Sequence, residues 1–106
     1  MNLQKMMKQA QAIQQKVQET QERIEAQEFS GTAGGGMVTV RLNGKNRLLG
    51  ASIDASLLKP EEKEMLEDML VAAFNDARDQ VDSTQSEEMG KLTGGLGLPP
   101  GMKLPF

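Results

Sequence analysis

Two long helical patterns on either side of a short strand-forming region constrain this 106-residue chain more than any other feature. The patterns cover about residues 2–27 and 60–89, and the strands must fit between them, at about 28–54. At about 1.5 Å of rise per residue, each helix is expected to be about 40 Å long. A strand of about six to eight residues covers only about 20–27 Å. The helices must therefore extend past any sheet, and their apolar stripes predict a second copy of the chain that covers them.

The first helical pattern is a coiled-coil-like seam with alternating spacings of three and four residues. Its members are Leu3, Met6, Ala10, Ile13, Val17, Thr20 and Ile24. The charges oppose the helix dipole, because Lys5 and Lys8 lie near the N-terminus and the glutamates lie toward the C-terminus. Each such placement costs a few tenths to about 1 kcal/mol at an exposed helix end. These unfavourable placements are consistent with binding to an external partner. They are equally consistent with random sequence change on a surface that tolerates it.

Three strand patterns follow the first helix. They are expected at residues 29–33, 38–42 and 47–54, with a triple glycine at 34–36 between the first two. The Asn43-Gly44 pair predicts a hairpin, because both residues accept a positive φ. The third pattern has Leu49, Ala51 and Ile53 on one face. The outcome is a three-stranded antiparallel meander.

The second helical pattern begins at Pro60, which suits a first helical turn. Its expected buried stripe is Met65, Leu66, Met69, Leu70, Ala73, Phe74, Ala77 and Val81. Beyond Val81 the stripe fades, and glycines and prolines become frequent after residue 90. The sequence therefore predicts one α+β domain over residues 1–90 and a Gly/Pro-rich flexible tail over 91–106.

The composition excludes most enzyme chemistry. The chain has no cysteine and no histidine, which removes thiolate metal sites, cysteine and histidine nucleophiles, and the usual general base at neutral pH. The triple glycine lacks phosphate-loop spacing, and the acidic pairs of the second helix are interpreted as a solvated face. We expect no enzyme, no cofactor, no metal and no small-molecule substrate. The polar N-terminus and the lack of a membrane-length apolar run predict a cytoplasmic protein.

Charge is distributed unevenly along the chain. The net charge is −3, and residues 60–90 contribute ten acidic residues. Residues 1–18 contain three lysines and no acid. The candidate phosphate-binding residues in the first half are Lys5, Lys8, Arg41, Lys45 and Arg47. In a dimer each group would occur twice and could neutralise duplex phosphates, although an ordinary solvated surface would have the same composition.

Several segments together closely resemble the YbaB/EbfC family of bacterial nucleoid-associated proteins. They are Met6–Gln11, Gly34–Leu42, Asn43-Gly44, Ser52–Asp54 with Ser56–Leu58, Glu64–Asp68, Ala72–Ala77 and Leu98–Phe106. The resemblance covers nearly the whole chain. Two departures are the missing Gly-rich leader before Met6 and Ala55, which stands where the family often has proline and loosens the approach to the second helix.

The resemblance implies an α-β-β-β-α protomer, a tweezer-shaped homodimer and binding to double-stranded DNA. It also implies a place on the nucleoid, with effects on nucleoid organisation and gene expression, and no catalytic residue. The family's helical arms map onto Lys5, Lys8 and Lys16 in the first helix, and onto Lys91 near the second. A protein-interaction adaptor that uses coiled-coil-like arms, with incidental DNA binding, is the alternative.

Overall fold

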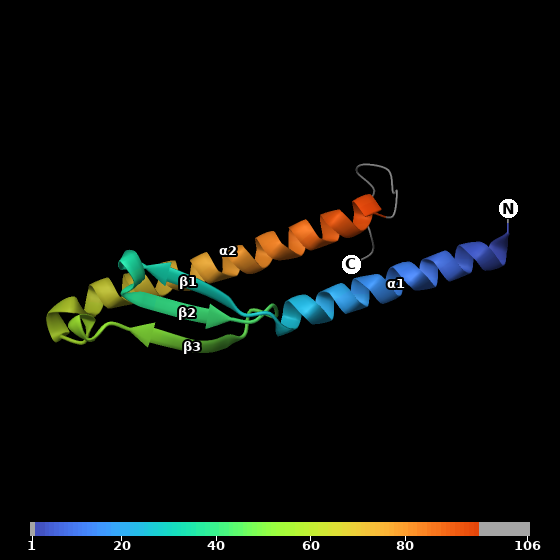
Figure 1. The fold of residues 1–106 in the computed structure, drawn as a ribbon. Helices are drawn as coiled ribbons and strands as arrows, with labels where there is room; N and C mark the ends of the chain where they lie inside the picture. Colours follow the sequence, from blue (N-terminus) through green and yellow to red (C-terminus); the bar gives the residue numbers. More distant parts are fainter. Residues whose placement is uncertain (1, 96–106) are drawn as a thin grey trace.

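The two helical patterns form α-helices, and the three strand patterns form β-strands, as the sequence predicted. In the computed structural model, which describes residues 2–95, the elements are α1 (Leu3–Ala26), β1 (Phe29–Ala33), β2 (Val38–Leu42), β3 (Leu48–Ile53) and α2 (Lys63–Gly95). The strands form one antiparallel sheet in the order β1-β2-β3 (Figure 1). The α+β class and the meander are confirmed. Most of the predicted tail, from residue 96 on, lies outside the described residues.

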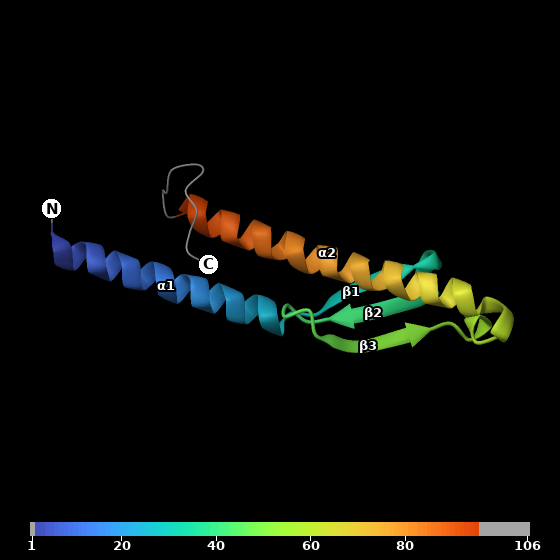
Figure 2. The same ribbon diagram turned by 180° about the vertical axis from the view of Figure 1, so that it is seen from behind.

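The chain is strongly elongated. Its principal extents are 71 × 23 × 17 Å, and its radius of gyration is 19.6 Å, whereas a compact domain of this length has about 13 Å. Figures 1 and 2 show why: α2 crosses the sheet and then continues beside α1, and the N-terminal part of α1 extends farther still. The predicted overhang of the helices is therefore present. We call residues 3–16 of α1 the α1 arm.

The main core lies between α2 and the first two strands. Val38, Val40 and Leu42 alternate along β2 and are buried under Ala73 and Ala77 of α2. These small alanines bring the helix backbone close to the sheet. The nearest approach is at β1, where Gly31 has no room for a side chain.

At Gly31, a Cβ atom would overlap the carbonyl oxygen of Ala73 and the backbone nitrogen of Ala77. Polar side chains of α2 also bond the outer edge of β1. Asp76 Oδ2 accepts from the Thr32 N–H at 3.0 Å, and Gln80 Nε2 donates to the Ser30 carbonyl at 2.8 Å. The helix is therefore fixed over β1 and β2.

The apolar seam of α1 is buried at its C-terminal end and exposed at its N-terminal end. Ile24 is 1% exposed and packs with Phe29 and Val81 in a second core cluster. Farther along the seam, Met6 is 47% exposed and Leu3 is 71% exposed. Within residues 2–95, burial along the seam therefore decreases from Ile24 and Thr20, through the half-buried Val17 and Ile13, to the exposed Met6 and Leu3.

Two apolar faces contain exposed side chains, and for the face on α2 the sequence pattern predicted burial. Met65, expected in the buried stripe of α2, is exposed. Leu49 and Ile53 of β3 are also exposed, although Ile53 pairs with the buried Val38. The reason is that α2 packs on β1 and β2 and leaves the helix side of β3 open.

The β2–β3 hairpin forms, but not by the predicted mechanism. The positive φ is at Asn46 (63°) and not at Asn43 or Gly44. Asn43 instead closes a longer loop, because its Oδ1 accepts from the N–H groups of Lys45 (2.9 Å) and Arg47 (3.0 Å). A side chain that imitates a backbone acceptor is a common use of asparagine in turns.

The connection from β3 to α2 is fixed by a cap at Asp54. Its carboxylate accepts from the N–H and the Oγ of Ser56, at 2.9 and 2.7 Å. These hydrogen bonds lower the pKa of Asp54. The stability that they provide is therefore present above the ordinary aspartate pKa and is lost as the pH falls through the lower folded value. The cap limits the freedom that Ala55 was expected to give.

The ends of α2 differ from the sequence pattern by a few residues. Pro60–Glu62 forms a separate 3-10 turn, and α2 begins at Lys63 and continues to Gly95. Lys91 therefore lies on α2 rather than in the tail. The helix continues through the single Gly90, because the lysine and leucine that follow it at positions 91 and 92 favour helix.

Substituting alanine for Gly31 tests the close contact of β1 with α2. We expect Gly31→Ala to lower the free energy of unfolding by about 1–3 kcal/mol, because the added methyl group must push α2 off the sheet. Gly90→Ala is the matched control, since nothing lies within 4 Å of a Cβ there, and it should stabilise α2 by about 0.5–1 kcal/mol. Urea unfolding measures both, and equal effects would contradict the packing.

Candidate nucleic-acid interface

The exposed lysines of α1 form a row along one side of the helix. Helical rotation places Lys5, Lys8 and Lys16 within an arc of about 80°, and the row extends about 16 Å along the axis. All three side chains are exposed. None forms an ion pair with any residue in the described range 2–95. We call these three residues the basic row.

The other predicted basic residues fall into two groups. Three of them already contact a carboxylate: the pairs are Arg41–Glu28 (2.8 Å), Lys45–Glu25 (3.8 Å) and Lys91–Glu88 (3.9 Å). Arg47 makes no ion pair within residues 2–95, and its backbone is held by Asn43. The charge available to an anionic ligand is therefore greatest on the basic row and at Arg47.

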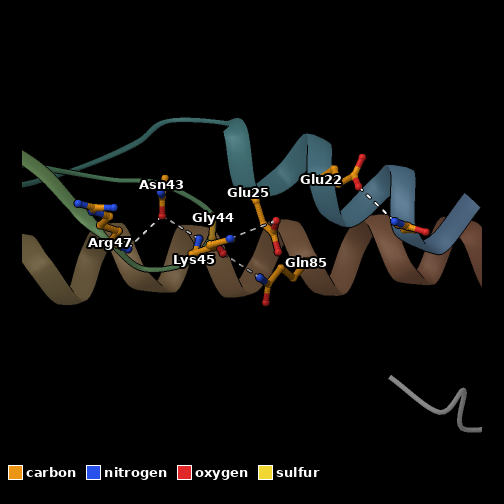
Figure 3. A network of polar contacts seen from close by, with 8 residues as sticks. Glu22, Glu25, Asn43, Gly44, Lys45, Arg47 and Gln85 are labelled. Atoms are coloured by element: carbon orange, nitrogen blue, oxygen red, sulfur yellow. Dashed lines mark hydrogen bonds and ion pairs between the residues drawn. The ribbon is translucent and has the colours of Figure 1, made fainter.

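Arg47 and Lys45 lie where the hairpin loop meets the two helices, as Figure 3 shows. The Gly44 N–H donates to the Glu25 carbonyl at 3.3 Å, and Gln85 Nε2 donates to the Gly44 carbonyl at 3.2 Å. A Cβ at Gly44 would overlap the backbone of α1, so glycine is required there. We call this meeting of residues 23–25, 43–47 and 85–88 the junction.

The basic residues lie along a line and do not surround a pocket. Glu25, at the junction, is about 30 Å along α1 from Lys5. The hollow between α1 and α2 is lined by Gln21, Ile24, Glu25, Gln85 and Met89, and none of these is basic. Cations spread along a helix suit a long polyanion better than a small molecule.

Within residues 2–95, the structure gives no support for other kinds of site. No group of three or more acidic, histidine or cysteine residues is arranged to hold a metal ion there. No helix in the same range combines the length and the apolar character that a membrane span requires.

Comparison with known proteins identifies the family. The model of the YbaB/EbfC DNA-binding family matches residues 1–96. The chain belongs to the YbaB/EbfC DNA-binding family. The resemblance seen in the sequence is confirmed, and the family is one of DNA-binding proteins and not of enzymes.

Similar proteins match over almost their whole length. The chain is 54% identical to a nucleoid-associated protein of Granulibacter bethesdensis over 105 residues, which cover 99% of this chain and 98% of that protein. It is 50% identical to one of Rhodospirillum rubrum with the same coverage. The crystal structure of an uncharacterized protein from Helicobacter pylori has a TM-score of 0.75 and 26% identity, covering 89% of this chain and 99% of that one.

One charged contact in this YbaB/EbfC chain was not singled out from the sequence. Arg23 Nη2 of α1 lies 2.6 Å from Glu88 Oε2 of α2, although 65 positions separate the two residues. Local patterns carry no signal for such a contact. The spacing of the sequence does place Arg23 with the basic row, because Arg23 follows Lys16 by seven positions and Lys5 by eighteen. Arg23 therefore lies on the same side of α1 as these lysines.

Proposed function

We propose that this YbaB/EbfC protein is a nucleoid-associated homodimer that binds double-stranded DNA mainly through the phosphate backbone. It would act in the cytoplasm, on the nucleoid, and affect DNA conformation, nucleoid organisation and gene expression. The basic row carries the proposal: Lys5, Lys8 and Lys16 project from one side of α1 and have no acidic partner among residues 2–95.

Backbone binding follows from the kind of side chain in the row. Lysine is a point charge on a flexible stem, which suits phosphate but carries little base specificity. The described residues also include only two aromatic side chains, Phe29 and Phe74, and Phe29 is buried. Stacking on single-stranded bases is therefore disfavoured, and a duplex is the better ligand.

A second copy of the chain is supported by apolar surface at two places. The exposed side chains are Leu3, Met6 and Met7 on the α1 arm, and Leu48, Leu49 and Ile53 on β3. The outer edge of β1 is bonded by Asp76 and Gln80, whereas β3 has no such cover from residues 2–95. Open apolar edges of this kind are normally covered in solution.

A protein-interaction adaptor is the second candidate function, and the α1 arm is the feature that supports it. Leu3, Met6 and Met7 give its tip an apolar side that a helical protein partner could bind. DNA binding by the purified protein separates the two functions, since an adaptor requires no salt-dependent affinity for duplexes.

Replacing Lys5 and Lys8 together by glutamine tests the DNA-contact role of the basic row. If both bind phosphate, affinity should fall similarly on unrelated duplexes. The slope of log K against log salt should also shrink, by roughly 0.9 for each phosphate that a lysine no longer neutralises. Gel shifts across a salt series measure both quantities.

The control is the pair Lys59→Gln and Lys63→Gln, which removes the same charge at the end of the molecule opposite the α1 arm (Figure 1). Both lysines are exposed and lie beside the 3-10 turn that precedes α2. An equal loss of affinity in the control would mean that only net charge matters and would contradict a localised site on α1.

Sedimentation equilibrium tests the dimer. At micromolar protein we expect twice the chain mass of 11.6 kDa, because the surfaces left open by one protomer are too apolar to stay solvated. A folded species of 11.6 kDa under the same conditions would overturn the proposed assembly.

A further inference from the structure

We propose that Arg23 is a further phosphate contact of α1 and that Glu88 restrains it. While the Arg23–Glu88 ion pair is closed, the duplex would contact α1 only along the basic row. When the pair opens, the contact would extend to Arg23. The inference rests on the proposed function, since it adds a fourth cation and its acidic competitor to the basic row.

The position of Arg23 supports the first part. Eighteen residues are five complete helical turns, so Arg23 lies directly in line with Lys5, about 27 Å along the axis. Lys16 lies between the two on nearly the same line. The Arg23 side chain is 64% exposed. A duplex that follows the basic row toward the sheet therefore meets Arg23 next.

The contacts of Glu88 support the second part. One oxygen, Oε2, lies 2.6 Å from Arg23 Nη2, and the other, Oε1, lies 3.9 Å from Lys91 Nζ. One carboxylate thus holds a cation from each helix. Glu88 is also the less exposed partner, at 28%. The acid is anchored beside the helices while the guanidinium remains open to solvent.

A phosphate can compete for Arg23 under these conditions. Ion pairs with one largely solvated partner contribute little to stability and weaken with salt. The guanidinium fork also matches phosphate geometry, and it can bind a phosphate with two hydrogen bonds. When Arg23 turns to a phosphate, the negative Glu88 remains nearby and repels the duplex. Glu88 therefore opposes engagement at the junction in two ways.

The ion pair is not the main tie between the two helices, so its removal leaves the junction intact. Ile24, Phe29 and Val81 form a buried cluster there. Gln85 also bonds the Gly44 carbonyl without involving Arg23 or Glu88. A change in DNA binding on removal of the Glu88 charge can thus be separated from unfolding, with thermal melting as the check.

Glu88→Gln and its neighbour Glu87→Gln form a matched pair. Both change the net charge equally, but Glu87 is exposed and makes no ion pair with residues 2–95. In gel shifts over a salt series, we expect Glu88→Gln to tighten binding and to steepen the salt slope by about 0.9, the value for one additional neutralised phosphate. Glu87→Gln should leave the slope unchanged.

Arg23→Gln, alone and combined with Glu88→Gln, identifies the cation that is released. The steepening should disappear in the double variant. Equal slopes for the Glu87 and Glu88 variants, or a steepening that persists without Arg23, would overturn the inference while wild-type binding stands. If the wild-type chain shows no salt-dependent binding to duplexes, the proposed function itself fails, and the inference fails with it.

Discussion

The close contact between Gly31 of β1 and the backbone of α2 determines the rest of this structure. Because no side chain fits between Gly31 and the Ala73–Ala77 turn, α2 lies over β1 and β2 and leaves β3 open. The same contact aims the C-terminal half of α2 past the sheet, where it meets α1. The core, the open apolar strand and the paired helices therefore follow from one glycine and two alanines.

Among residues 2–95, three of the basic residues near the junction have acidic partners, whereas the lysines of the α1 arm do not. Near the junction, acids from α1 and α2 neutralise Arg23, Lys45 and Lys91. Farther from the junction, the lysines of the α1 arm have no acidic partner in residues 2–95. An acidic protein can in this way present a locally basic arm, and the net charge of −3 is a poor guide to its partner.

Periodicity and turn chemistry were enough to predict the elements, the meander and the overhang of the helices. They could not predict features that depend on tertiary distance. The exposure of Met65, the positive φ at Asn46 and the packing need for Gly44 follow from where other elements lie. For the candidate site, the sequence supplied all three lysines of the basic row, but it could not separate them from Arg41, which is held by Glu28.

The central claim, that the basic side of α1 faces the DNA backbone, is open to direct measurement because the chain has no cysteine. Ala12 lies between Lys8 and Lys16 on that side. A cysteine introduced there and coupled to an iron chelate should cut a bound duplex, whereas one at the exposed Glu67 of α2 should not. Cleavage from position 67 but not from position 12 would contradict the account.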